Sequence, residues 1–262
     1  MPQHDSGLVD VLAHLGVRDL GIVVAHDDRH PVSKLAAEDP DAVARKLRDA
    51  FPQTGYWPLL LLEDVEPRTP ADIADMVTRG WRPEDLVTGA ESVALAADMT
   101  IDDATYCFVP GGKPATPVAP PPDLAPRPEE AAELGSGWTA RQPALLVVRT
   151  QAPWESLAHI GFGLYNESGS DARHVRFHRY LWETCEGVVT AVGTSQMNVS
   201  LPGRPLDPVT AFELADRIFY YCNDMETVLA DRLYADPDEE DFGVLLAGMF
   251  TAGLSTLPLW WD

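Results

Sequence analysis

The sequence is poor in cysteine, in lysine and in long apolar runs. It has three cysteines among 262 residues, an odd number without a Cys-x-x-Cys pair, which argues against a disulfide framework or a thiolate zinc site. No apolar stretch approaches the roughly 20 residues that a transmembrane helix needs. The first residues also lack the basic and apolar regions of a secretory signal. We therefore expect a soluble, cytoplasmic protein with no membrane partner.

Positive charge is scarce relative to negative charge. The chain has 41 acidic and 19 basic side chains and a formal net charge of -22. A nucleic-acid binder needs clustered Lys and Arg to displace counterions from phosphates, so this balance argues against nucleic acid as a partner. It favours a basic protein or metal cations, although uniform negative charge also maintains solubility.

Strand and helix signals alternate on both sides of a proline-rich segment. This alternation predicts an α/β (α+β) fold with a mixed β-sheet flanked by helices. The expected strands are 20–25, 59–62, 106–109, 144–149, 187–192 and 196–201. The expected helices are 6–15, 40–51 after an Asp39 N-cap, 70–78, 90–97, 171–186, a helix from Pro208 after an Asp207 N-cap, 225–234 and 241–252.

The proline-rich segment is a candidate domain boundary. Eight prolines lie between Pro110 and Pro128. Because proline fixes φ and lacks an N–H, this stretch is expected to be an extended surface connector. We therefore divide the chain into an N-terminal α/β segment, 1–109, a Pro-rich linker or loop, 110–137, and a C-terminal α/β segment, 138–262.

The helix expected at 171–186 carries the most suggestive polar side chains. His174 and His178 lie within about 40° of each other on a helical wheel, and histidines four residues apart are a common zinc pair. The same stripe carries Phe177 and Leu181, which favours packing against the core with the imidazoles hydrogen-bonded. We expect no metal and no cofactor. A metal-dependent hydrolase that uses this helix face is the alternative.

A nucleophilic Cys–His pair can also be drawn from Cys222 and His159, although the sequence cannot place the two side chains within hydrogen-bonding reach. Cys222 lies on the apolar stripe of its helix, which favours inert packing. An enzyme would be supported if a concave pocket gathered several polar side chains. The side chains in question are His26, His159, His174 and Asp224.

Several short motifs resemble one known family. The chain closes on Trp260-Trp261-Asp262 and carries Tyr221-Cys222-Asn223-Asp224, Trp182, Gly163-Leu164-Tyr165-Asn166 and, upstream, Thr54-Gly55-Tyr56-Trp57-Pro58. Through these motifs it resembles the bacterial family catalogued as domain of unknown function 4253, over about residues 54–62 and 144–262. The residues that the resemblance marks, without a role, are Trp57, Asn166, Trp182, Tyr221, Cys222, Asp224, Trp260, Trp261 and Asp262.

The resemblance implies architecture rather than activity. Because matched segments flank the prolines, it implies that the N-terminal and C-terminal segments pack as one unit. Many members read Trp-Asn-x-Cys-Pro where this chain reads Tyr165-Asn166-Glu167-Ser168-Gly169, so a role of that cysteine does not carry over. The adjacent indoles of Trp260 and Trp261 are expected to be buried, because chain ends are ordered only when packed.

The absence of catalytic motifs and the pervasive acidity favour a non-enzymatic binding or interaction protein. A basic protein is the partner that such a surface would suit. The sequence leaves open whether the protein is an enzyme, and it names neither a substrate nor a partner.

Overall fold

The computed structural model describes most of the chain. The described residues are 6–17, 21–24, 32–62, 82–91, 99–101, 108–110, 120–122, 124–139, 144–160, 162, 171–193, 195–222, 224–235 and 241–261. The helix expected at 70–78 lies outside them. Within them, no helix is long and apolar enough to cross a bilayer.

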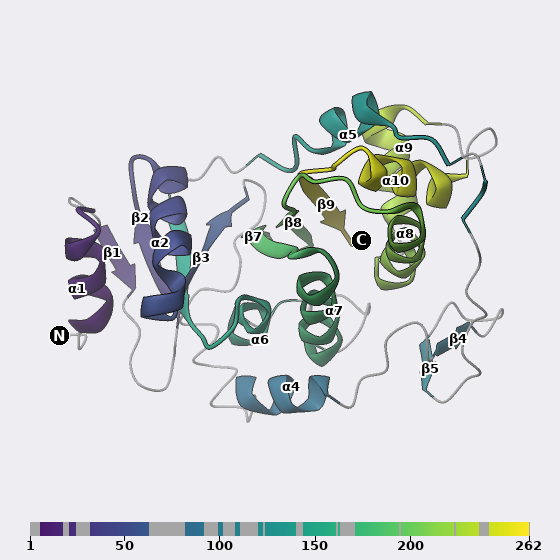
Figure 1. The fold of residues 1–262 in the computed structure, drawn as a ribbon. Coiled ribbons are helices and arrows are strands. Elements are labelled where there is room, and N and C mark those ends of the chain that lie inside the picture. Colours follow the sequence, from purple (N-terminus) through teal and green to yellow (C-terminus); the bar gives the residue numbers. More distant parts are fainter. Residues whose placement is uncertain are drawn as a thin grey trace.

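The elements alternate along the chain (Figure 1). The strands of the main sheet are β1 (Gly21–Val24), β2 (Val32–Ala36), β3 (Tyr56–Leu61), β6 (Ala144–Arg149), β7 (Val188–Val192), β8 (Gln196–Ser200) and β9 (Thr256–Trp260). A separate two-stranded sheet pairs β4 (Met99–Ile101) with β5 (Phe108–Pro110). The helices are α1 (Ser6–His14), α2 (Pro40–Thr54), α4 (Pro83–Ala90), α5 (Pro128–Leu134), the 3-10 turn η2 (Pro153–Glu155), α6 (Ser156–Ile160), α7 (Asp171–Cys185), α8 (Pro208–Tyr221), α9 (Met225–Leu233) and α10 (Phe242–Thr251).

The main sheet is mixed, which confirms the predicted α+β fold class. Among the described residues its strand order is β1-β2-β6-β3-β7-β8-β9. Only the β3–β7 pair in this order is parallel, and the other neighbours are antiparallel. Strand β6, which follows the proline-rich segment, lies between β2 and β3, which precede it. The sheet therefore contains strands from both sides of that segment.

Both faces of the sheet are covered at its centre. Along β3, Trp57, Leu59 and Leu61 belong to one buried cluster, whereas Tyr56 and Leu60 belong to another. The first cluster includes side chains of α7 to α10, and the second includes side chains of α1 and α2. Because successive strand side chains point to opposite faces, a strand covered on both faces reads as a continuous apolar run. This explains the Leu-rich sequence of β3.

Two predicted aspartate caps are confirmed. The Asp39 side chain accepts a hydrogen bond from the backbone N–H of Ala42 at 2.9 Å, and Asp207 accepts from Thr210 at 3.1 Å. A proline follows each aspartate at the first helical position. Its fixed φ suits the helix, and its missing N–H costs nothing there. The starts of α2 and α8 were therefore readable from sequence.

Other expectations were wrong or incomplete. The helix α4 (Pro83–Ala90) was not predicted, because Pro83 and the acidic side chains after it form a helix start that the periodicity did not reveal. The helix expected at 90–97 falls almost entirely on residues that the structure does not describe. The range 110–137 was expected to be linker or loop, yet its end forms α5, whose Ala131 and Leu134 are buried. Strand β9 was missed because it contains Pro258, which a strand tolerates at the edge of a sheet.

The segment after α5 is fastened to the sheet by one buried amide. Asn198, at the middle of β8, accepts a hydrogen bond from the backbone N–H of Trp138 at 2.8 Å and donates to the Trp138 carbonyl at 2.7 Å. The Trp138 indole N–H donates to the Leu259 carbonyl at 3.1 Å, and the Arg232 guanidinium lies 5.0 Å from the ring centroid. The Asn198 side chain thus pairs with both backbone polar groups of Trp138, as a neighbouring strand would.

We expect Asn198→Ala to destabilise the protein by about 1–3 kcal/mol, because both polar groups of the Trp138 backbone lose their partner. Urea unfolding followed by circular dichroism measures the change. Gln196→Ala, at a half-buried position of the same strand, is the matched control and should change stability by less than about 0.5 kcal/mol. Equal losses from both variants would contradict this role of Asn198.

Candidate functional site

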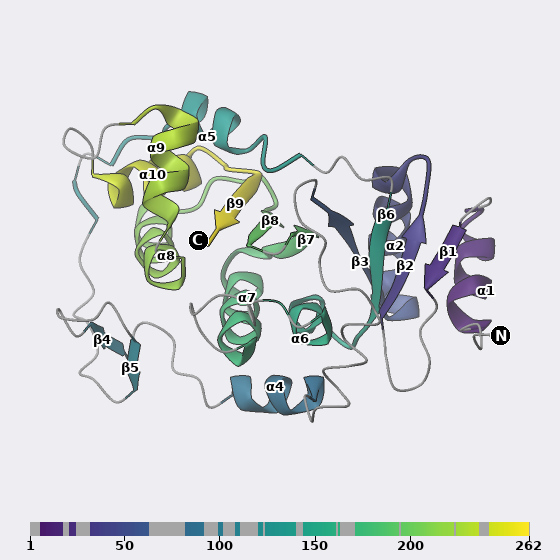
Figure 2. The same cartoon turned by 180° about the vertical axis from the view of Figure 1, so that it is seen from behind.

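A cleft of about 620 Å³ lies where β6 ends and β3 begins. Both cartoon views place α4 beneath α6 and α7 (Figures 1 and 2). Of these helices, α4 and α6 contribute residues to the lining of the cleft. The residues that line it are Thr54, Gly55, Glu84, Val87, Thr88, Arg149, Thr150, Gln151, Glu155 and His159. Most of these side chains are polar, so the cleft can hydrogen-bond a ligand.

The cleft lies where the backbone at Gly55 approaches the backbone at Thr150 closely. The Thr150 N–H donates to the Gly55 carbonyl at 2.9 Å. Gly55 has φ 71°, in the left-handed region that glycine adopts without a steric penalty. A Cβ at Gly55 would also approach the Thr150 carbonyl to 3.3 Å. Glycine therefore allows α2 to end against the end of β6, and this places Thr54 in the cleft.

The Glu155 side chain is held by a residue of the same turn, Thr150. The Thr150 hydroxyl lies 3.0 Å from Glu155 Oε2 and 3.1 Å from the Ala152 carbonyl. A hydroxyl has one proton, so it can donate to one of these oxygens at a time. Donation to the carboxylate is the stronger bond, because the acceptor is charged. Thr150 therefore restrains the Glu155 carboxylate in the lining of the cleft.

His159 is the imidazole of the cleft. Burial lowers its pKa, and the negative charges of Glu155 and Glu84 oppose this shift without reversing it. The imidazole is therefore neutral at pH 7. The lining then contains two carboxylates, those of Glu84 and Glu155, and one guanidinium, that of Arg149, so negative charge is in excess in the cleft.

The two helical histidines lie elsewhere, inside the core. His174 Nδ1 lies 2.6 Å from the Tyr221 hydroxyl oxygen, and His178 Nε2 lies 3.1 Å from the same oxygen. Because a phenol carries one proton, it can donate to only one imidazole, and the other imidazole must donate its N–H to the phenol oxygen. Among the described residues, the remaining ring nitrogens of both histidines have no hydrogen-bond partner.

Burial keeps the three hydrogen-bonded side chains of His174, His178 and Tyr221 uncharged. Burial lowers the pKa of His178 to about 3. It also lowers the pKa of His174 well below the ordinary value, with smaller contributions from the charges of His178 and Arg173. Burial raises the pKa of Tyr221 well above its ordinary value, so the phenol keeps its proton. The group is a set of uncharged rings joined by hydrogen bonds.

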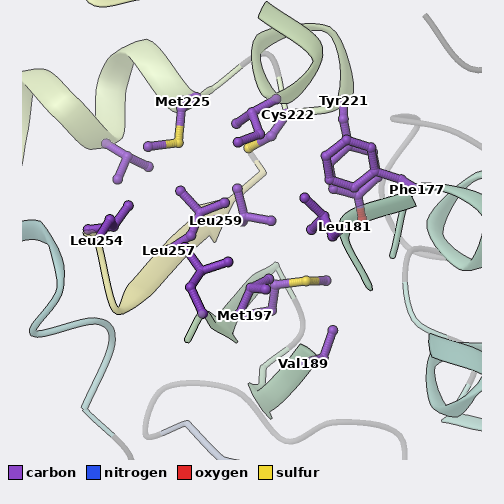
Figure 3. Packing of buried hydrophobic residues seen from close by; sticks show 14 of the residues in the cluster. Phe177, Leu181, Val189, Met197, Tyr221, Cys222, Met225, Leu254, Leu257 and Leu259 are labelled. Atoms are coloured by element: carbon purple, nitrogen blue, oxygen red, sulfur yellow. The ribbon is translucent and has the colours of Figure 1, made fainter. Parts of the chain in front are cut away.

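Aromatic and aliphatic side chains enclose the three hydrogen-bonded rings. Phe177 stacks on Tyr221 with ring centroids 3.7 Å apart, and Trp261 meets Tyr221 edge to face at 5.3 Å. Figure 3 shows Tyr221 and Phe177 beside Leu181, in the same packed cluster as the side chains of β8 and β9. No group of three His, Cys, Asp or Glu in the described part of the chain is arranged to hold a metal ion. The two imidazole nitrogens that converge do so on the phenol oxygen.

The described thiols are buried and protonated. Cys222 donates to the Trp260 carbonyl at 3.0 Å, and burial raises its pKa to about 12. Burial raises the pKa of Cys185 to about 11. The structure does not join Cys222 to His159, which lies on α6 at the cleft. Neither thiol is a nucleophile at neutral pH, because the thiolate is the reactive form.

The residues marked by the family resemblance divide into interior and surface positions. Trp57 is buried and its indole N–H donates to the Val189 carbonyl at 3.0 Å. Trp261 is buried as expected, and its indole N–H donates to the Tyr221 carbonyl at 3.3 Å, whereas Trp260 is only half-buried. Trp182 is 38% exposed. Asp224 immediately precedes α9, and His26, Asn166 and Asp262 lie outside the described residues.

Of the side chains proposed for a concave pocket, the structure places His159 in one. Sequence reasoning missed Glu84, Thr150 and Glu155. The only signal for two of them was their place in the chain, because Thr150 and Glu155 directly follow the predicted buried strand at 144–149. Glu84 comes from α4, a distant part of the chain, and only the folded structure brings it to the cleft.

The fold and the cleft together define an α+β protein with a polar surface site. Residues 144–262 match the model of the family described as Domain of unknown function (DUF4253). The match confirms the predicted resemblance there and does not include residues 54–62. No curated protein and no solved structure matches the chain. The matched region contributes Arg149, Thr150, Gln151, Glu155 and His159 to the cleft.

Proposed function

We propose that this is a non-enzymatic binding protein whose cleft receives a cationic side chain of a basic partner protein. The observation that carries the proposal is the pair of carboxylates, Glu84 and Glu155, which come from different elements and line one cleft. Thr150 restrains Glu155, so less side-chain entropy is lost when a cation binds.

The lining suits a guanidinium group best. A guanidinium offers five N–H donors in a planar fork and no acceptor, so it needs several oxygen acceptors around it. Besides the two carboxylates, the Thr88 hydroxyl and the Gln151 amide oxygen supply them. The neutral His159 adds no positive charge. The net charge of -22 would attract a basic partner over longer distances and raise its association rate.

The reactive side chains of the described region support a binding role over a catalytic one. The raised pKa values of Cys185 and Cys222 disfavour thiolate chemistry. His174 and His178 are each 1% exposed. A hydrolytic centre there would require substrate to enter the packed core. The metal-dependent hydrolase therefore stays the less supported alternative.

The proposal is tested with two short peptides that differ by one charge. We expect acetyl-Gly-Gly-Arg-Gly-Gly-amide to bind about tenfold more tightly than the same peptide with neutral citrulline, because two partly exposed ion pairs are each worth up to about 1 kcal/mol. Chemical-shift titration of the ¹⁵N-labelled protein measures both dissociation constants. Equal affinity for the two peptides would contradict the proposal.

Matched variants separate the cleft from the general charge of the protein. Glu84→Gln combined with Glu155→Gln should remove most of the preference for arginine. Glu129→Gln combined with Glu226→Gln changes the net charge equally at exposed positions on α5 and α9 and should leave the preference unchanged. If the second pair of substitutions has the larger effect, the attraction belongs to the whole surface and the cleft is not the site.

A further inference from the structure

Two tryptophans lie at the surface beside the acidic cleft. Trp154 is half-buried in η2, and Trp182 of α7 is 38% exposed. Their ring centroids are 5.7 Å apart with an interplanar angle of 42°. Exposed indoles at protein surfaces are typical of binding sites, because each ring buries a large apolar area when a partner covers it.

The indole pair and the cleft share their supporting elements. Trp154 directly precedes Glu155, which lines the cleft. Trp154 also packs with Val87 of α4, another cleft residue, against the small buried cluster between α4, α6 and α7. Figures 1 and 2 show these helices side by side. The two features therefore belong to one continuous face of the molecule.

The charges on this face are also linked. Arg179, one turn before Trp182, donates to Glu183 at 2.8 Å. This hydrogen bond and the charge of Glu183 raise the pKa of Arg179, with smaller contributions from Glu91 and Glu155. Glu155 thus acts on Arg179 as well as on His159 in the cleft. Three carboxylates, those of Glu91, Glu155 and Glu183, therefore act on the Arg179 guanidinium.

We infer that Trp154 and Trp182 extend the cleft into a docking surface for a basic peptide segment that carries an apolar side chain beside its arginine. The inference rests on the proposed function. Charge complementarity selects this occupant, because a second copy of the chain would bring its own large negative charge to the same face. The arginine enters the cleft between the carboxylates, and the apolar side chain covers the indoles.

The test compares two arginine peptides. In an extended segment, residues two positions apart point to the same side, so leucines two positions before and after the arginine probe both peptide directions. We expect acetyl-Leu-Gly-Arg-Gly-Leu-amide to bind the wild-type protein roughly tenfold more tightly than acetyl-Gly-Gly-Arg-Gly-Gly-amide. Trp182→Ala should reduce this advantage to about twofold or less and leave the affinity for the glycine peptide unchanged.

Tyr234→Ala is the control, because Tyr234 is an exposed aromatic residue at the end of α9, and it should keep the full advantage. If Trp182→Ala does not fold, the indole N–H resonance of Trp182 in the wild-type protein gives the answer, since it should shift with the leucine peptide and stay in place with the glycine peptide. An equal affinity for both peptides, or an advantage that survives Trp182→Ala, overturns the inference. Failure of the wild-type protein to bind the glycine peptide overturns the proposed function instead.

Discussion

Trp261→Ala is expected to destabilise the protein by about 3–5 kcal/mol, the range for removing a fully buried indole. Trp261 is 1% exposed and contacts the rings of Phe162, His174 and Tyr221. Its loss would open a cavity in the centre of the aromatic core and leave the Tyr221 carbonyl without its indole donor. Guanidinium chloride unfolding, followed by far-UV circular dichroism, measures the change.

The neighbouring indole provides the comparison for Trp261. Trp260 is half-buried, so Trp260→Ala should cost clearly less, about 1–2 kcal/mol. Tyr234→Ala, at a 92% exposed position, should change stability by less than about 0.5 kcal/mol. If Trp260→Ala were the more damaging of the two tryptophan substitutions, the packing described for the end of the chain would be wrong.

The second large effect is a loss of stability in mild acid. The pKa of His178 falls from 6.5 to about 3 on folding, so the unfolded chain binds a proton at this residue below about pH 6.5 and the folded chain does not until about pH 3. The free energy of unfolding is therefore unaffected by His178 above about pH 6.5, and it declines as the pH falls from 6.5 towards 3. Between about pH 7.5 and about pH 5.0 the loss is about 2 kcal/mol from His178 alone. His174 shifts in the same direction and adds to it.

Substitution isolates this contribution from other titrating groups. Urea unfolding at the two pH values gives the change in stability for the wild-type protein and for His178→Gln. The variant should lose about 2 kcal/mol less than the wild type between them. His14→Gln, at an exposed position of α1, is the control and should behave as the wild type. Identical pH dependence in His178→Gln and the wild type would show that the His178 imidazole titrates alike in both states.

Much of the fold could be predicted from sequence because its signals are local. The Asp-Pro starts of α2 and α8 determine their own positions through a side-chain cap and a fixed φ. Strand β6 and the β7–β8 hairpin were also predicted close to their observed bounds. The order of strands in the sheet could not be predicted, since β6 pairs with β2 and β3 across the proline-rich segment. Such pairing depends on long-range packing rather than on any local pattern.

The histidine helix illustrates the same limit at a candidate site. The spacing of His174 and His178 correctly placed both on one apolar face, and hydrogen-bonded imidazoles were the favoured interpretation. Their shared partner, Tyr221, comes from a different helix and carried no signal of that role. The cleft was missed for a related reason. Glu84 is far from Glu155 in sequence, so their convergence appears only once α4 packs against α6 and α7.

The structure separates the polar side chains into two environments with different chemistry. Around Tyr221, burial removes charge, and the side chains stabilise the interior through hydrogen bonds and ring contacts. In the cleft, carboxylates face solvent beside a neutral imidazole. A ligand can reach only the second environment without unfolding part of the core. This accessibility is the physical basis for assigning the binding role to the cleft.

A double-mutant cycle between Glu155 and the charge of the ligand tests that assignment most directly. The cycle combines wild-type protein and Glu155→Gln with the arginine and citrulline peptides, and its coupling free energy isolates the interaction of the two charges. We predict a favourable coupling of about 0.5–1 kcal/mol for Glu155. The same cycle with Glu226→Gln should give a coupling near zero. A coupling near zero for Glu155 in protein that binds the arginine peptide would contradict the account, because the cation would then lie elsewhere.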